Sequence, residues 1–266
     1  MSSVRDEAHR ARGPEAPASA AARIREFGWL LRQELYLLRL RWFWYVVMVS
    51  FTPLLMMAFL WMLVGPEPDR LLYVITGSVA QGLCSAAMLS LGQDIGTMKD
   101  AGTFEYYASL PISKLNFILA VATRAVILAL PSSLVLLAAG SLFFRLPARP
   151  SPVVALVLIS AGYSLAGLGA FVGFFSPEGR VAGWATQLVH PVLVFLAPVY
   201  LPPESLPPVL RFTSRFFPTT YVASTLRASL LGQVTAATWK ELAGLAGWTV
   251  LSLWIASTRL SWRARD

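Results

Sequence analysis

Six apolar runs, each close to 20 residues, constrain the fold of this chain more than any other feature. They lie at roughly 42–64, 71–93, 118–144, 153–175, 181–201 and 239–258. A helix of about 20 mostly apolar residues crosses the hydrocarbon core of a bilayer. Charged residues make up 14% of the chain, and the mean hydropathy is +0.60, whereas soluble domains carry about 25% charged residues. The sequence therefore predicts an all-α integral membrane protein with six transmembrane helices.

Positive charge predicts the orientation of these spans. Six spans place both termini on one side, and fifteen of the Arg and Lys residues then lie on that side, against seven on the other. Because cytoplasmic segments carry an excess of Arg and Lys, we predict a multi-pass protein of the cytoplasmic (inner) cell membrane with both termini inside. Residues 1–22 lack an apolar run and are interpreted as a disordered cytoplasmic tail, and residues 261–266 as the cytoplasmic C-terminus. The net charge of +8 is assigned to orientation and not to nucleic-acid binding.

The segment 23–41 predicts an amphipathic helix at the membrane interface. Its apolar residues recur at spacings of three and four, which form one narrow stripe on a helix. Arg25, Arg32 and Arg39 recur every seven residues and flank the stripe, where they would reach lipid phosphates. The alternative is a helix packed against another protein, and both can hold at once. The stripe consists of Ile24, Phe27, Leu31, Leu35, Leu38 and Trp42.

Two further patterns concern packing. The connection at about 202–238 is long and apolar, so we predict one or two short helices that lie on or re-enter the outer membrane face between spans five and six. Four glycines recur in the fourth span, where small residues allow helix backbones to approach closely. They are Gly162, Gly167, Gly169 and Gly173.

Patterns of catalytic chemistry are missing from the spans. The sequence has no H-E-x-x-H pair, no G-x-S-x-G elbow and no phosphate-binding G-x-x-x-x-G-K-[ST] loop. The single cysteine, Cys84, permits no disulfide within the chain, and no metal site is predicted. Arg124 lies within the third span. It is interpreted either as an arginine that snorkels at the cytoplasmic rim or as a buried functional residue.

Two segments between the spans resemble a known family. The inner segment KDAGTFEYYASLPISK, residues 99–114, is similar to an acidic-Gly-Thr-x-Glu segment followed by a Leu and a small-Pro-small turn. The outer segment LPPVLRFTSRFFPTTYVASTLRASLLG resembles a Leu-Pro, Asn-Pro-x-x-Tyr and later Arg pattern, although Phe217 stands where Asn is more common. With six spans and an entry helix, these segments resemble the type-2 ABC transporter permeases over about residues 24–260.

That resemblance implies a function and a set of partners. Residues 42–260 would form a type-2 ABC transmembrane domain, a permease without its own ATPase site, which exports a hydrophobic or amphipathic substrate such as a drug or lipid. Two copies of a separate nucleotide-binding ATPase would hold ATP and Mg, and a second permease copy would complete a homodimer in membrane lipid. Export of a polysaccharide or glycolipid is the main alternative. An ATPase-independent membrane enzyme or assembly factor, and a structural membrane anchor, are further alternatives.

The resemblance also implies a coupling helix at residues 99–110 that docks on the ATPase. In this interpretation Gly102 permits close approach, Thr103 caps the helix, and Glu105 offers a charge to a basic residue of the ATPase. Phe104, Tyr106 and Tyr107 offer contact area. The short loop 176–180 with Glu178 would be a second, smaller contact. The alternative is an ordinary solvated loop at 99–110 and a plain turn at 176–180.

Spans two and five would line the pathway between two permease copies. Polar side chains seldom face lipid tails, so Gln81 and Gln187 are the main candidates, although Gln also joins helices through hydrogen bonds. His190 is interpreted as a structural hydrogen-bonding residue, or as a substrate-binding or pH-sensing one. The candidate residues are Gln81, Ser85 and Met88 in span two, and Gln187, His190, Val194 and Phe195 in span five.

Overall fold

The computed structural model describes residues 20–39, 42–65, 67–110, 112–143 and 150–259. Within these ranges every regular element is a helix. Four helices there are long and apolar enough to cross a membrane, namely Trp42–Val64, Arg70–Asp100, Lys114–Phe143 and Val153–Phe175. The prediction of an all-helical protein with several spans is confirmed in this form.

The first four expected spans correspond to these helices. Helices α3 (Trp42–Val64) and α8 (Val153–Phe175) have the bounds expected from their apolar runs. The second span continues past residue 93 as α4 (Pro68–Leu83), the π-helical η1 (Cys84–Leu89) and α5 (Ser90–Asp100). Helix α5 is not apolar throughout, but it packs on α8 and α9, and this packing stabilises it beyond the lipid-soluble stretch. The third span, α7 (Lys114–Phe143), begins four residues before the expected 118.

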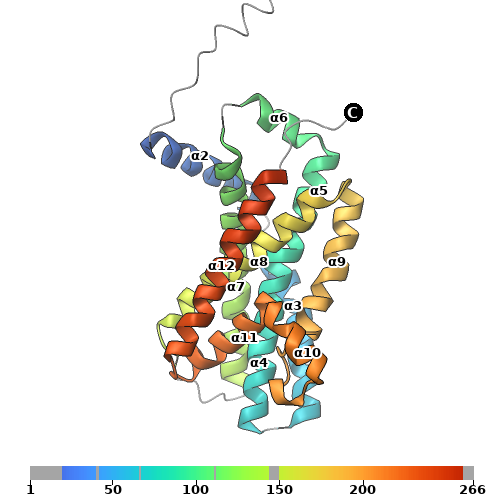
Figure 1. Cartoon of the computed structure of the whole chain (residues 1–266), viewed down its shortest axis with the longest axis vertical. Coiled ribbons are helices and arrows are strands. Elements are labelled where there is room, and N and C mark those ends of the chain that lie inside the picture. The colour runs from blue at the N-terminus through green and yellow to red at the C-terminus, as the bar shows by residue number, and fades with distance from the viewer. Residues whose placement is uncertain (1–19, 40–41, 66, 111, 144–149, 260–266) are drawn as a thin grey trace, which may run out of the picture.

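The expected fifth and sixth spans correspond to α9 (Gly179–Phe195) and α12 (Ala236–Arg259). Helix α9 has 17 residues, and the apolar residues of α12 are interrupted by Lys240, Glu241 and several Gly, Ser and Thr residues. Neither is among the four helices whose length and composition alone suit a span. Both nevertheless run alongside the other long helices in Figure 1. The count of six spans stays a prediction.

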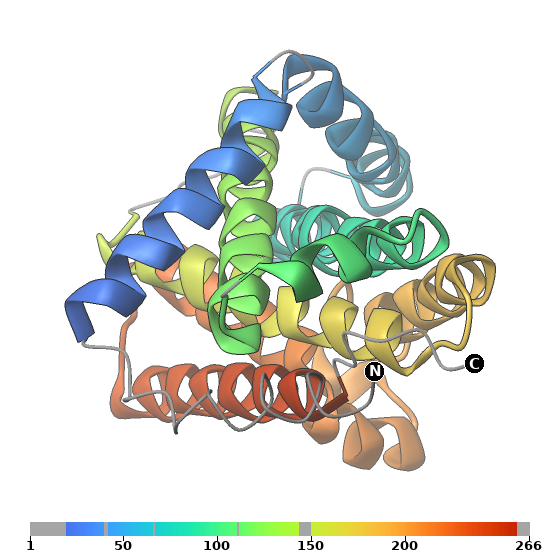
Figure 2. The same ribbon diagram turned by 90° about the horizontal axis from the view of Figure 1, so that it is seen from above.

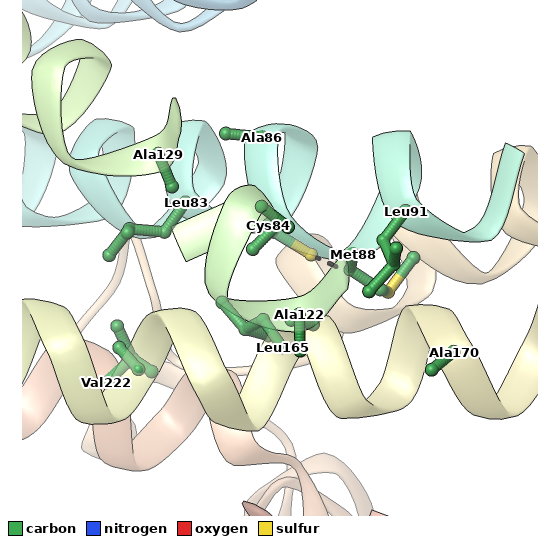
Figure 3. Packing of buried hydrophobic residues seen from close by; sticks show 14 of the residues in the cluster. Leu83, Cys84, Ala86, Met88, Leu91, Ala122, Ala129, Leu165, Ala170 and Val222 are labelled. Atoms are coloured by element: carbon green, nitrogen blue, oxygen red, sulfur yellow. Dashed lines mark hydrogen bonds between the residues drawn. The ribbon is translucent and has the colours of Figure 1, made fainter. Parts of the chain in front are cut away.

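Helix α8 lies at the centre of the bundle. It contacts α12, α5, α7, α11 and η1, and the view along the bundle shows these helices around it (Figure 2). The buried core joins Cys84 and Met88 of η1 to Leu165 and Ala170 of α8, with Ala122 of α7 nearby (Figure 3). Small side chains at these helix crossings let the backbones come close, which is typical of helix packing in lipid.

Gly169 is the clearest case of such an approach. A Cβ at Gly169 would collide with the backbone carbonyl of Met88, which cannot move aside as a flexible side chain would. A Cβ at Gly173 would meet Ile95 and the carbonyl of Gly92 in the same way. The prediction that the fourth-span glycines permit close helix packing is confirmed at these two positions.

The bundle has two distinct ends (Figure 1). Helix α2 (Ala20–Leu38), α6 (Thr103–Ser109) and the last turns of α5 and α12 lie at one end, which we call the α6 end. Helix α10 (Pro208–Thr213) and the α3–α4 connection lie at the other, the α10 end. Between α9 and α12 the chain also forms two 3-10 turns, Pro203–Ser205 and Ser214–Phe216, and α11 (Pro218–Leu230).

The long connection between α9 and α12 is helical, as the sequence predicts. Helix α11 is not a surface element, because it packs against α8, α12 and α4. Arg227 of α11 donates hydrogen bonds to the carbonyls of Pro198 and Val199 at 3.2 Å each, and its guanidinium lies 4.2 Å from the centre of the Tyr73 ring. These contacts join α11 to the end of α9 and to α4. Re-entry into the membrane stays a prediction.

Helix α2 begins at Ala20, three residues before the expected start at 23. The alanines at 20–22 are strong helix formers, which explains the earlier start. The greater part of the expected tail, residues 1–19, lies outside the described residues, as do Pro111 and residues 260–266.

Candidate functional site

Helix α6 is the element that the sequence singles out for coupling, and the structure makes it shorter than expected. Lys99 and Asp100 belong to α5, and α6 spans Thr103–Ser109 and not 99–110. Gly102 joins the two helices with a φ of +66°, and a Cβ there would meet no atom within 4 Å. Glycine is thus favoured here by the left-handed backbone conformation and not by close approach. Gly102, and not Thr103, holds the N-cap position, and no side chain caps α6.

The aromatic residues of α6 face in two directions. Phe104 and Tyr107 are buried, and their ring centres lie 6.0 and 4.7 Å from that of Phe117 in α7. The Phe104 ring also lies 5.8 Å from that of Phe174 in α8. The expectation that Phe104 and Tyr107 offer contact area to a partner is therefore wrong in this conformation. These two residues anchor α6 to the bundle.

The outer face of α6 is exposed, although the Tyr106 ring centre lies 5.5 Å from that of Tyr107. Tyr106 is 58% exposed, Glu105 is exposed, and Thr103 is half-buried. Glu178 is also exposed, at the N-cap position of α9, and its side chain makes no capping hydrogen bond. A groove of about 520 Å³ lies beside α6, between α2 and the α6–α7 connection. Its lining includes Trp29, Tyr36, Leu110 and Ile112. This end of the bundle thus presents an acidic side chain beside aromatic and apolar surface.

Lys99 and Asp100 attach the end of α5 to the loop between α8 and α9. The Nζ of Lys99 donates to the carbonyls of Phe174 at 3.0 Å and Ser176 at 2.5 Å, at the C-terminus of α8. The Oδ1 of Asp100 accepts from the N–H of Gly179 at 2.9 Å, at the N-terminus of α9. A cation thus faces a helix C-terminus and an anion a helix N-terminus, and both arrangements are favoured by the helix dipoles.

A second charged cluster lies beneath α6. Arg124 of α7 has a side chain that is only 12% exposed, with its Nη2 2.6 Å from Asp94 Oδ2 of α5 and its Nε 3.3 Å from Glu34 Oε2 of α2. The snorkelling interpretation of Arg124 is wrong for this conformation, because the guanidinium pairs with two carboxylates inside the protein. The Arg124–Glu34 pair is an ion pair without hydrogen-bond geometry, and both atoms otherwise lack a partner.

Burial dominates the electrostatics of this cluster. Glu34 is 3% exposed, and desolvation raises its pKa above the ordinary value of 4.5, although Arg124 acts in the opposite direction. Burial also raises the pKa of the Tyr107 hydroxyl, and the nearby Glu34 carboxylate adds to this effect. The Nε2 of Gln33 lies 3.5 Å from the same hydroxyl. Through these contacts α2, α5 and α7 meet directly under α6.

Helix α2 is fixed to α7 by polar contacts and by a face other than the predicted stripe. Glu26 Oε1 accepts from the N–H of Ser113 at 2.6 Å, and Asn116 Nδ2 donates to the carbonyl of Arg23 at 3.0 Å. Leu30 and Glu34 are the buried side chains of α2, whereas Ile24 of the stripe is 71% exposed. Helix α7 contacts the neighbouring face of α2 and leaves Ile24 of the stripe exposed, and the placement of the stripe in the membrane interface stays a prediction. Arg25, Arg32 and Arg39 are exposed, as an interface helix requires.

The pathway candidates occupy different environments. Ser85 Oγ lies 2.9 Å from His190 Nε2, so η1 and α9 are joined by a polar pair that is half-buried in this single chain. Gln81 is buried and accepts a hydrogen bond from the Tyr200 hydroxyl.

The remaining candidates divide into buried and exposed residues. Met88 is fully buried in the core and Val194 is 1% exposed, so this conformation does not present them to a passing solute. Gln187 is exposed, and Phe195 is 53% exposed on α9. The surface that a pathway would use in this conformation therefore contains Ser85, Gln187, His190 and Phe195.

Sequence reasoning missed Glu34 and Asp94, and it placed Lys99 and Asp100 in the coupling helix 99–110 and not in the contacts that join α5 to the α8–α9 loop. Glu34, Asp94, Lys99 and Asp100 each carry a charge close to a predicted span, and a lone arginine inside a span is itself a signal that a carboxylate lies nearby. The sequence does not say which carboxylate. Tyr45 was missed as well, although its hydroxyl donates to the carbonyl of Ala86 in η1 at 2.9 Å and lies 2.6 Å from Ser90 Oγ.

In the part of the chain that the structure describes, no three His, Cys, Asp or Glu side chains gather as metal ligands would.

Comparison with curated proteins found no similar sequence. A family model described as ABC-2 type transporter matches residues 25–231, which include most of α2, the four apolar helices and α6. This match covers more than half of the chain, and with the apolar helices it identifies a multi-pass membrane permease. The chain belongs to the ABC-2 type transporter family, as a membrane transport subunit of an ABC transporter.

Proposed function

We propose that this chain is the membrane subunit of an ATP-driven exporter, and that α6 receives the motion of a separate nucleotide-binding ATPase. The observation that carries the proposal is the division of α6 into two faces. Phe104 and Tyr107 anchor the helix to α7 and α8, whereas Glu105 and Tyr106 point away from the bundle. A helix fixed on one face and exposed on the other transmits a push from a partner to the spans.

The charged contacts under α6 support this role. Any displacement of α6 acts on Phe117 and on the Glu34–Arg124–Asp94 cluster, which joins α2, α5 and α7. Lys99 and Asp100 extend the same connection to the α8–α9 loop. ATP binding to the partner would thus move several spans as one body between two packings, and the ATPase would bias which packing is populated.

We further propose that two copies of this chain form the pathway, with α9 and η1 of each facing the other. Phe195 on the exposed face of α9 suits a hydrophobic or amphipathic substrate, and Ser85, His190 and Gln187 supply a few polar groups. The α6 end would face the cytoplasm, where two copies of the ATPase hold ATP and Mg. This orientation agrees with the positive charge counted on the side of the termini.

The coupling proposal is tested with Glu105→Arg combined with Tyr106→Ala. Both side chains are exposed, and the ring contact that Tyr106→Ala removes, 5.5 Å to Tyr107, leaves the contact of Tyr107 with Phe117 of α7 in place. Co-expressed with a cognate nucleotide-binding ATPase, the double variant should fold but lose co-purification of the ATPase, or lose substrate-stimulated ATP hydrolysis. Glu204→Arg, an exposed acidic residue at the α10 end, is the matched control and should retain both. Normal assembly and coupled hydrolysis in the double variant would refute the proposal.

The dimer proposal is tested by crosslinking. The native Cys84 is fully buried, so a Cys84→Ala background leaves no thiol. Gln187→Cys in that background should give a disulfide-linked dimer on oxidation in the membrane. Trp254→Cys, which lies on α12 and is 63% exposed, is the control and should stay monomeric. Crosslinking through residue 254 and not through residue 187 would place the partner copy on a different face.

A further inference from the structure

A second groove borders α2, and it shares Arg32 and Tyr36 with the groove beside α6 but is otherwise lined by other residues. Helices α2 and α3 each pack against α7, and the three lie together at one edge of the bundle (Figure 2). Between them is a pocket of about 610 Å³. This volume is within the range of about 300–1,000 Å³ that holds small-molecule ligands. Its walls include Leu31, Leu35, Trp42, Val46, Ile127 and Pro131.

The walls of this groove are almost entirely apolar and continue into lipid-facing surface. Ile127 is 39% exposed and Trp42 is 51% exposed, and further along the same two helices Leu134 and Met48 are 59% and 66% exposed. In a membrane such side chains face acyl chains and not water. The groove therefore suits the hydrocarbon part of a lipid better than a polar polypeptide.

Two arginines lie at the edge of the groove. Arg32 and Arg39 are among its lining residues and are exposed, and neither pairs with a carboxylate of the described residues. The guanidinium of Arg32 lies 5.6 Å from the centre of the ring of Trp29, a residue that lines the neighbouring groove beside α6. Guanidinium groups bind phosphate oxygens in a two-pronged geometry, so unpaired arginines beside an apolar groove match a phosphate joined to an acyl chain.

Gly28 adds an opening to the α2 wall. It lines the groove, and a Cβ at this position would meet no atom within 4 Å. The absence of a side chain here is not explained by helix packing, because no neighbour occupies the space. It leaves the groove wider at the level of the arginines.

We infer that the groove between α2, α3 and α7 is a binding site for one anionic phospholipid. Its acyl chain lies against Leu35, Val46 and Ile127, and its phosphate contacts Arg32 and Arg39. The bound lipid would fill the space between α2 and α3 and so hold α2 against α7. This site does not depend on the identity of the exported substrate or of the ATPase.

The test is native mass spectrometry of the purified full-length chain with added phosphatidylglycerol or with phosphatidylcholine of the same acyl chains. We expect the wild-type chain to retain one phosphatidylglycerol at an affinity about tenfold above that for phosphatidylcholine, since hydrogen bonds to charged groups are stronger than neutral ones. Arg32→Gln combined with Arg39→Gln should remove this preference. Arg25→Gln, on the same helix but outside the groove, should keep it.

A second variant tests the groove itself. Gly28→Phe should fill the apolar space without a backbone clash and abolish retention of both lipids. Gly244→Phe is the matched control, because a Cβ at Gly244 on α12 also meets no atom within 4 Å. Circular dichroism and size-exclusion chromatography establish that both variants are folded. The proposal is overturned by unchanged lipid retention in Gly28→Phe, by equal retention of the two lipids by the wild-type chain, or by a peptide bound in place of lipid.

Fluorescence gives an independent measurement in bilayers. Trp42 lines the groove, so a phosphatidylglycerol with brominated acyl chains should quench it at low mole fraction in phosphatidylcholine vesicles. The quenching of Trp42 fluorescence is obtained as the difference in quenching between the wild-type chain and Trp42→Phe. This difference should disappear in the Arg32→Gln, Arg39→Gln variant. A difference that persists in that variant would show that Trp42 senses bulk lipid only and would overturn the site.

Discussion

The Nη2 of Arg124 lies 2.6 Å from the Oδ2 of Asp94, and this contact joins the third apolar helix, α7, to α5, the last part of the second. The same guanidinium lies 3.3 Å from the buried carboxylate of Glu34 in α2. One side chain thus connects three helices at the level where α6 rests on the bundle.

Arg124→Leu should destabilise the protein strongly. The substitution leaves the buried Glu34 and the partly buried Asp94 without their cation, and removal of one partner from a buried ion pair typically costs about 3–5 kcal/mol. The apparent melting temperature of the purified chain in detergent should therefore fall by several degrees. Arg124→Leu combined with Glu34→Leu should recover part of the loss, because it removes a buried charge together with its partner. Equal melting temperatures for wild type and Arg124→Leu would contradict this account.

The stability of the protein should depend on pH through Glu34. Burial raises the pKa of Glu34 in the folded state, so its protonated form is favoured by folding. The stability that the protonated Glu34 carboxyl contributes is fully present below the ordinary pKa of 4.5. It is lost as the pH rises through the pKa that Glu34 has in the folded state. Arg124, Asp94 and Tyr107 surround this carboxyl and are unchanged in Glu34→Gln. The melting temperature of wild type relative to Glu34→Gln should therefore decrease from pH 4 to pH 8, and a constant difference would contradict the assignment.

Asp100→Ala should loosen the start of α9. The carboxylate accepts from the N–H of Gly179, and hydrogen bonds to charged groups contribute more than neutral ones. Amide hydrogen exchange of a peptide covering residues 177–183 should become about tenfold faster. Glu178→Ala removes a neighbouring carboxylate that caps nothing, so exchange in that variant should match wild type. If exchange became faster in Glu178→Ala but not in Asp100→Ala, Glu178 and not Asp100 would cap α9.

Gly169→Ala should separate α8 from η1. The added Cβ collides with the backbone carbonyl of Met88, and overpacking of this kind typically costs about 1–3 kcal/mol. Gly244→Ala adds the same methyl group where nothing lies within 4 Å and should be neutral or stabilising, because alanine favours helix. Thermal unfolding of the two variants in the same detergent measures the difference. A Gly169→Ala chain as stable as wild type would mean that the two backbones do not approach as closely in the membrane.

The apolar helices could be predicted from the sequence because the bilayer selects on local composition. Residues 42–64 and 153–175 became α3 and α8 with the bounds that their apolar runs predict, since a helix in lipid must satisfy its own backbone hydrogen bonds whatever lies beside it. The amphipathic helix before them and the family resemblance were also readable from local patterns. The family comparison confirms the latter.

The tertiary structure decided which face of each helix packs. Phe104 and Tyr107 are as aromatic as Tyr106, and nothing in the local sequence says that the first two anchor α6 and the third is exposed. Glu34 pairs with an arginine on α7 that is distant in sequence, and the stripe is divided, because Leu31, Leu35 and Leu38 line the groove between α2, α3 and α7 whereas Trp42 begins α3. In a chain with apolar residues on most faces, hydrophobicity fixes which segments enter the membrane but not their rotation. That rotation is set by small-residue contacts and charge pairs between helices, which exist only once the helices are assembled.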